Sequence, residues 1–121
     1  MGKDSLFSSF KNAWRGLIIA LQTERNLRLH FICAVLVLIV LIFFQIGGLK
    51  LALILLTIGL VLVTELINTT IENLVDLIQP EFHEIAGNAK DIAAGAVLTA
   101  AIVAVLVGVV ILGPYFIQLF F

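Results

Sequence analysis

The chain has 121 residues, of which 62% are hydrophobic and only 12% are charged, and its formal net charge is −1. A soluble domain of this length leaves much of its surface in water, so it could not bury so large an apolar fraction. The composition therefore argues against an ordinary soluble domain and favours a membrane protein. The single cysteine, Cys33, excludes a disulfide framework within the chain and a Cys/His metal cluster.

Apolar residues recur every three or four positions between residues 4 and 24, which predicts an amphipathic helix. The apolar stripe consists of Leu6, Phe7, Phe10, Trp14, Leu17, Ile18 and Leu21. This stretch is too polar to cross a bilayer, and an indole such as that of Trp14 suits the headgroup region. We therefore expect a helix that lies on the membrane surface.

Three longer apolar segments follow, and they predict transmembrane helices at residues 29–47, 50–78 and 90–113. Gly47-Gly48 supplies the first turn, residues 79–90 form a polar connector, and the last helix is expected to stop near Gly113-Pro114. The expected fold is an all-α integral membrane protein, a single membrane domain over residues 1–121. The last segment is rich in alanine and glycine, which let helices approach closely in lipid, so we expect an oligomer.

The distribution of positive charge predicts the orientation in the membrane. Five of the seven lysine and arginine residues lie in the first thirty positions, which places the N-terminus in the cytoplasm. The first two crossings then return the 79–90 connector to the cytoplasm, and the third places the C-terminus outside. We therefore expect a multi-pass protein of the cell membrane in which Glu24, Glu72 and Lys90 meet at the cytoplasmic interface, where ATP is available.

Residues 65–76 place several polar side chains on a single helical face. At 100° per residue, that face contains Glu65, Asn68, Thr69, Glu72 and Asp76. An acid at the centre of a membrane helix costs about 2.5–3.5 kcal/mol. Several acids together therefore indicate a function rather than a structural hydrogen bond, although Asp76 fits a solvated helix end equally well.

This polar face suits phosphoryl transfer. A carboxylate in apolar surroundings is a candidate general base, and one nearer the headgroups can bind Mg²⁺. Glu24 can add a second oxygen ligand, while Lys90-Asp91 supplies a cation for phosphate and another acid. The chain has no phosphate-binding loop of the G-x-x-x-x-G-K-[ST] type, no kinase glycine loop and no H-R-D motif, so a kinase here must be of an unrelated type.

The sequence resembles the prokaryotic diacylglycerol kinase family over about residues 10–113. The similar blocks are residues 65–76 with His83, residues 88–98 (Asn-Ala-Lys-Asp-Ile-Ala-Ala-Gly-Ala-Val-Leu), Trp14-Arg-Gly16, and residues 23–30 (Thr-Glu-Arg-Asn-Leu-Arg-Leu-His). The form of residues 24–30 is similar to the Gram-positive branch, whose members act as undecaprenol kinases.

The resemblance implies a homotrimer with active sites shared between chains, and ATP and Mg²⁺ as cofactors. It implies Glu65 as the general base that deprotonates a lipid hydroxyl, and Asn68 as a residue that orients the substrate or the phosphate. It assigns the Mg²⁺ to Glu24 and Glu72. The nucleotide contacts that it implies are Asn12, Glu24, Glu72, Glu81, Phe82, His83, Lys90 and Asp91, and the lipid entrance is bordered by Trp14, Gly16 and Arg28.

Several alternatives remain at this level. The acceptor is expected to be undecaprenol, with diacylglycerol as the alternative, since both present a primary alcohol at the interface. A small proton-coupled exporter would also use a membrane glutamate, but its site should lie near the midplane, and it gives Lys90-Asp91 no role. If the protein were a purely structural subunit, the acidic residues within the membrane would have no function. We expect His30 to form a hydrogen bond within the bundle rather than to act in catalysis.

Overall fold

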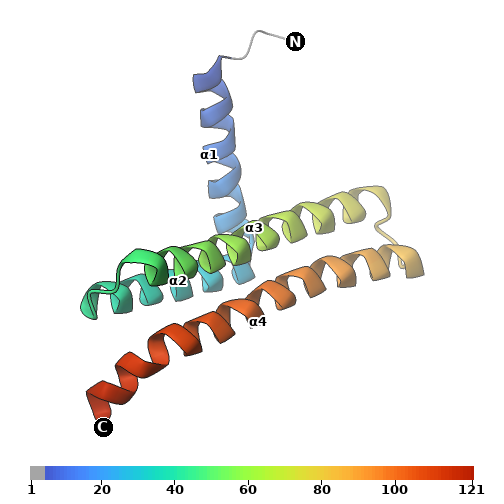
Figure 1. Ribbon diagram of the computed structural model, residues 1–121. Helices are drawn as coiled ribbons and strands as arrows, with labels where there is room; N and C mark the ends of the chain where they lie inside the picture. The colour runs from blue at the N-terminus through green and yellow to red at the C-terminus, as the bar shows by residue number, and fades with distance from the viewer. Residues whose placement is uncertain (1–4) are drawn as a thin grey trace.

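The computed structural model describes residues 5–121, and over that range the chain forms four α-helices. They are α1 (Leu6–Thr23), α2 (Arg25–Phe43), α3 (Gly48–Ile78) and α4 (Glu84–Phe120). Helices α2, α3 and α4 pack together, whereas α1 rises away from them (Figure 1). The prediction of an all-helical chain is confirmed. The expected first residue of the surface helix, residue 4, lies outside the described residues.

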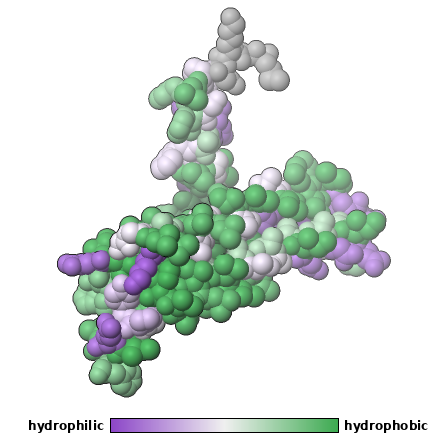
Figure 2. All heavy atoms as spheres, in the orientation of Figure 1, coloured by the Kyte–Doolittle hydropathy of each residue, from purple (hydrophilic) through white to green (hydrophobic). Residues whose placement is uncertain are grey.

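The surface of the bundle is mostly apolar. Hydrophobic side chains cover its middle, and hydrophilic residues gather toward its two ends (Figure 2). Helices α2, α3 and α4 are each long and apolar enough to cross a membrane. A helix satisfies its own backbone hydrogen bonds, so these three helices suit a solvent of lipid chains. The prediction of three membrane-spanning candidates is confirmed.

The turn between α2 and α3 is built on a left-handed residue. Gln45 has a φ of 54°, and the Ile46 N–H donates to the Leu41 carbonyl at 2.9 Å, which closes the end of α2. Ile46 is buried with Leu41, Ile54 and Ile111 in the hydrophobic core at this end of the bundle. The turn therefore fixes how α2, α3 and α4 meet.

Replacing Gln45 with glycine is expected to stabilise the fold, because a side chain in the left-handed region costs about 1 kcal/mol that glycine does not incur. The measurement is the thermal unfolding temperature in detergent micelles. Gln79→Gly is the matched control, since Gln79 ends α3 with a φ of −135° and gains nothing from glycine. An equal rise in both variants would contradict the assignment of strain to Gln45.

The boundaries of α2 correct the predicted 29–47 segment, because the helix begins and ends earlier. Only Glu24 separates α1 from α2, so the two helices form a sharp corner. The Arg28 guanidinium holds this corner by donating to the carbonyls of Leu21 at 2.9 Å and Gln22 at 3.0 Å, in the last turn of α1. These bonds satisfy carbonyls that the end of α1 leaves free.

Helix α4 extends beyond the predicted 90–113 segment at both ends. It begins at Glu84, within the expected connector, because the His83 side chain accepts a hydrogen bond from the Ile85 N–H at 3.2 Å and caps the helix. Two alanines, Glu84 and Lys90 favour a helix over residues 84–90, and the helix continues through Gly87 and Asn88. The polar connector is therefore shorter than predicted.

The expected stop near Gly113-Pro114 is wrong, because α4 continues through Pro114 to Phe120. Contacts on the far side of the proline explain the difference. The Phe44 ring lies 5.5 Å from that of Tyr115 and 5.1 Å from that of Phe116, and the Lys50 ammonium donates to the Tyr115 hydroxyl at 3.1 Å. Packing of this kind lets membrane helices tolerate proline.

Candidate active site

Glu65 lies at the centre of the candidate site. It belongs to α3, and only 2% of its surface is exposed. Its Oε2 lies 3.8 Å from the Nε2 of His30 on α2, and the His30 side chain is partly buried. A buried carboxylate requires a partner of opposite charge or hydrogen bonds to offset its lost hydration. Sequence reasoning expected His30 to form a hydrogen bond in the bundle, whereas the structure places its Nε2 beyond hydrogen-bond distance of the Glu65 carboxylate.

Asn68 links Glu65 to Glu72 along α3. Its Nδ2 donates to the Glu72 Oε1 at 3.2 Å, and its side chain also interacts with Glu65. Its Oδ1 is buried and has no hydrogen-bond partner. Asn68 therefore orients Glu72 and leaves one acceptor atom free for a ligand.

Glu24 brings a third carboxylate from the corner between α1 and α2. It is partly buried, and its side chain makes no capping hydrogen bond. Both Glu24 and Glu72 lie near enough to Glu65 for their charges to repel its carboxylate. Neighbouring carboxylates of this kind are stabilised by a shared cation.

The residues fit a magnesium ion that substrate phosphates help to hold. Within residues 5–121, no three His, Cys, Asp or Glu side chains cluster closely enough to form a metal site of their own. Mg²⁺ usually takes one or two carboxylates, and phosphate and water oxygens complete its shell. Glu24 and Glu72 offer oxygens of the required kind beside the buried Glu65.

Lys90 reaches the same face from α4. Its Nζ donates to the Asp76 Oδ1 at 2.6 Å, and Asp76 lies one helical turn beyond Glu72. The ion pair joins the first turns of α4 to the end of α3. A cation therefore lies beside the acidic face, where sequence reasoning placed a phosphate contact. Asp91 follows Lys90 and is exposed.

A single chain does not bring the other predicted residues to Glu65. Glu81, Phe82 and His83 lie exposed in the connection between α3 and α4, and the His83 ring caps α4. Asn12 and Trp14 line a shallow surface formed by α1 alone. Arg28 binds the end of α1, as described above.

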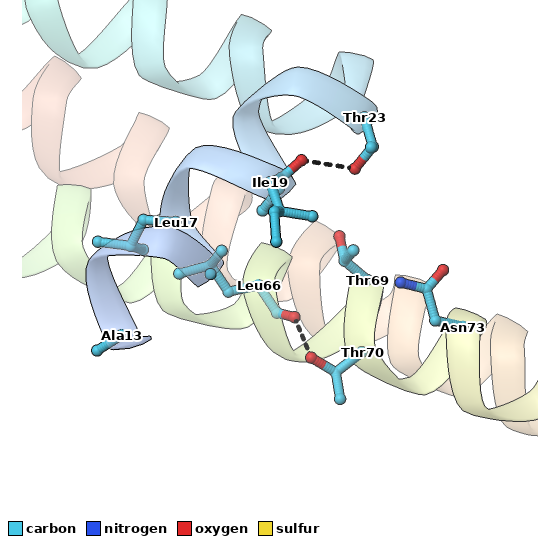
Figure 3. Close-up of a pocket in the computed structure, with 10 residues that line it drawn as sticks. Ala13, Leu17, Ile19, Thr23, Leu66, Thr69, Thr70 and Asn73 are labelled. Atoms are coloured by element: carbon cyan, nitrogen blue, oxygen red, sulfur yellow. Dashed lines mark hydrogen bonds between the residues drawn. The ribbon is translucent and has the colours of Figure 1, made fainter. Parts of the chain in front are cut away.

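A pocket of about 280 Å³ lies between α1 and α3 (Figure 3). Gly16, predicted to border the lipid entrance, is part of its wall. The full lining is Ala13, Gly16, Leu17, Ile19, Ala20, Thr23, Leu66, Thr69, Thr70 and Asn73. Sequence reasoning placed Thr69 on the polar face but gave it no role. The spacing of the small α1 residues at positions 13, 16 and 20 was the available signal for a cleft beside that helix.

Comparison with known proteins identifies the family. Residues 11–112 match the family described as prokaryotic diacylglycerol kinase. The chain is 43% identical over 111 residues to a diacylglycerol kinase from Synechocystis sp., covering 91% of this chain but only 63% of that protein. It is 40% identical over 108 residues to the undecaprenol kinase of Bacillus subtilis, covering 89% and 88% of the two chains.

A third relative, the diacylglycerol kinase of Escherichia coli K12, is 33% identical over 104 residues, covering 86% of this chain and 85% of that protein. The match to the family spans the acidic face, the α1–α2 corner and Lys90 together. The chain therefore belongs to the prokaryotic diacylglycerol kinase family and is a membrane lipid kinase of this type.

Proposed function

We propose that the protein transfers the γ-phosphoryl group of Mg-ATP to the hydroxyl of undecaprenol and so makes undecaprenyl phosphate. The alternative acceptor is diacylglycerol, which would give phosphatidic acid. The observation that carries the proposal is the buried Glu65 carboxylate with Asn68, Glu72 and Glu24 around it. This arrangement offers a base, an orienting amide and oxygen ligands for a cation within one site.

In the proposed reaction, Glu65 accepts the proton of the lipid hydroxyl while the lipid oxygen attacks the γ-phosphorus. The bond from that phosphorus to the bridging oxygen breaks, and ADP leaves with the electron pair. His30, with its Nε2 3.8 Å from the Glu65 carboxylate, holds the base in place. Glu65 then releases its proton to water, which restores the site.

Glu24 and Glu72 would hold the magnesium ion, whose charge would offset that of the phosphate oxygens. Asn68 keeps Glu72 oriented through the 3.2 Å hydrogen bond. Its free Oδ1 can only accept a hydrogen bond, so it does not suit an unprotonated phosphate oxygen. Lys90, held beside this face by Asp76, would contact the phosphates.

The remaining nucleotide contacts support a homotrimer with shared sites. Asn12 lies on a surface of α1 and Phe82 in the exposed α3–α4 connection, away from Glu65. A neighbouring chain that packs against the acidic face would bring such residues to the nucleotide bound there. Glu81, His83 and Asp91 would contact the nucleotide in the same way.

We place the protein in the cell membrane with its N-terminus and its active site facing the cytoplasm. The basic N-terminal region supports this orientation. Helix α1 runs across the direction of the other helices (Figure 1), as a helix in the headgroup layer would. The corner at Glu24 would then lie at the interface, beside the acids of α3.

Undecaprenol is favoured by the similarity of residues 24–30 to the undecaprenol kinase branch. The exporter and the structural subunit lose their support, because the family match spans nearly the whole chain.

The proposal is tested by supplying Mg-ATP labelled in the γ-phosphate to the protein in mixed micelles that contain equal amounts of undecaprenol and diacylglycerol. Preferential labelling of undecaprenol is the expected result. Preferential labelling of diacylglycerol would show that the acceptor is diacylglycerol rather than undecaprenol, while the proposed mechanism would stand. The absence of transfer to both lipids, with the protein folded, would overturn the proposed reaction.

A further inference from the structure

Helix α1 is exposed toward its start and packs against the bundle toward its end. Of the residues of α1, Ala20 is the one that is buried, whereas Leu6, Phe10 and Trp14 are exposed. The helix therefore projects from the other three (Figure 1). Its direction depends on the corner at Glu24, where α1 ends and α2 begins.

Glu24 has no bond of its own that would fix its side chain. It is the single residue between α1 and α2, and its backbone is extended. Its carboxylate makes no capping hydrogen bond, and it forms no ion pair within residues 5–121. The direction in which the carboxylate points therefore follows from the angle between the two helices. That angle brings it near enough to Glu65 for the two charges to repel.

Arg28 fixes this angle from the second turn of α2. Its Nη1 donates across the corner to the carbonyls of Leu21 at 2.9 Å and Gln22 at 3.0 Å, in the last turn of α1. Hydrogen bonds from a charged donor are the stronger kind, and a cation is favoured at the C-terminal end of a helix. Within the part of the chain that the structure describes, the guanidinium forms no ion pair. Arg28 therefore acts on the backbone of α1 and not on the Glu24 carboxylate directly.

We propose that Arg28 is a positioning residue for the metal site, because it ties the end of α1 to α2 and so holds the Glu24 carboxylate beside the acidic face of α3. The inference rests on the proposed function and deepens it, since Glu24 and Glu72 are the proposed magnesium ligands. It also gives Arg28 a role other than the one at the lipid entrance that the family resemblance implies. Without the two hydrogen bonds, α1 would move about the corner and carry Glu24 away from the ion.

The test compares Arg28→Gln, Arg28→Lys and Arg25→Gln in the full chain by titrating phosphate transfer with Mg²⁺ at saturating ATP and lipid. Arg28→Gln should raise the Mg²⁺ concentration for half-maximal activity about tenfold, the lower end of the usual cost of losing a residue that supports a metal ligand. The KM for the lipid should stay unchanged. Arg28→Lys keeps a charged donor, so it should keep most of the wild-type affinity for Mg²⁺.

The sign of the effect separates lost positioning from a change of charge. Loss of a positive charge near the site would by itself favour binding of a cation, so it would lower the Mg²⁺ requirement. Arg25→Gln is the matched control, because it removes the exposed cation next to Glu24 and leaves the bonds of Arg28 in place. It should not raise the Mg²⁺ requirement. An equal rise in Arg25→Gln and Arg28→Gln would overturn the inference.

A double variant shows whether Arg28 acts through Glu24. If it does, adding Arg28→Gln to Glu24→Gln should leave the Mg²⁺ requirement close to that of Glu24→Gln alone, because the ligand that Arg28 positions is already lost. Effects that multiply in the double variant would overturn the inference. A raised lipid KM with unchanged Mg²⁺ dependence in Arg28→Gln would overturn it too, and so would a lowered unfolding temperature with a proportional loss of all kinetic constants.

Trp14 gives a measurement of the corner that needs neither the metal nor the lipid substrate. It is the only tryptophan of the chain and lies on α1, so its fluorescence anisotropy reports on the motion of that helix. Arg28→Gln should lower the anisotropy, whereas Arg28→Lys and Arg25→Gln should not. Equal anisotropy in the wild type and Arg28→Gln would show that the two hydrogen bonds do not hold α1, and it would overturn the inference.

Binding of Mn²⁺ together with a non-hydrolysable ATP analogue keeps the inference distinct from the proposed reaction. Mn²⁺ takes the same oxygen ligands as Mg²⁺, and electron paramagnetic resonance detects its free form. Arg28→Gln should bind Mn²⁺ about tenfold more weakly than the wild type. If this holds while the wild type transfers no phosphate, the role of Arg28 stands and the proposed reaction fails. Equal binding by the two proteins, or no binding by the wild type, would overturn the inference.

Discussion

Replacing Glu65 with glutamine is expected to reduce phosphotransfer about 10²- to 10⁴-fold, the usual contribution of a general base. Glutamine has nearly the shape of glutamate, so the chain should still fold and insert. The amide does not accept a proton at neutral pH, and the lipid hydroxyl would then have to attack without a base. The measurement is the turnover number at saturating Mg-ATP and lipid in mixed micelles.

Glu84→Gln is the matched control, because it removes an exposed carboxylate from the first turn of α4 without touching the proposed site. Its activity should equal that of the wild type. The unfolding temperature of Glu65→Gln should show that the bundle is intact, since the change removes a buried charge. Turnover in Glu65→Gln equal to that of the wild type would remove Glu65 as the base and leave its burial unexplained.

The polar face of α3 could be predicted because it depends on one element alone. A helix turns 100° per residue, so the positions of Glu65, Asn68 and Glu72 in the sequence fix their common face. The structure shows the consequence in the hydrogen bond from Asn68 to Glu72. The apolar length of each spanning segment is likewise a local property, and this is why three candidate spans were correctly predicted.

The helix ends could not be predicted, because they depend on contacts between residues far apart in the chain. Pro114 is a stop signal in sequence, yet α4 continues because Tyr115 packs on Phe44 and its hydroxyl binds Lys50. The start of α2 at Arg25 depends on Arg28, which reaches back to bind the end of α1. Local propensity carries no information about such partners.

The acidic residues of the site could be predicted from the sequence, but the residues that lie next to them in space could not. Nothing in the spacing of α2 shows that His30 faces Glu65, because that contact depends on how two helices rotate against each other. The unbonded hydroxyl of Thr69 and the pocket beneath α1 arise in the same way. Similar motifs assign residues to a site without showing which chain contributes each one. The structure of a single chain shows which of these residues lie together within one subunit.

Replacing Glu24 or Glu72 with glutamine is expected to raise the Mg²⁺ concentration needed for half-maximal activity by about ten- to a hundredfold. Even residues that only support a metal ligand typically cost this much in affinity when they are changed, and a direct carboxylate ligand should cost no less. Each variant keeps an oxygen but loses the negative charge that a hard divalent cation requires. The measurement is a Mg²⁺ titration of activity at fixed, saturating ATP and lipid.

Glu24→Gln and Glu72→Gln should also differ from Glu65→Gln in their response to added Mg²⁺. Excess Mg²⁺ should restore much of the turnover of Glu72→Gln and Glu24→Gln, because the base is still present, but it should not restore that of Glu65→Gln. Glu84→Gln should leave the titration unchanged. Wild-type Mg²⁺ dependence in both Glu24→Gln and Glu72→Gln would contradict the metal assignment, and the repulsion among the three carboxylates would then require another cation to relieve it. Lys90, which is held near Glu72 by Asp76, is the side chain placed to supply that charge.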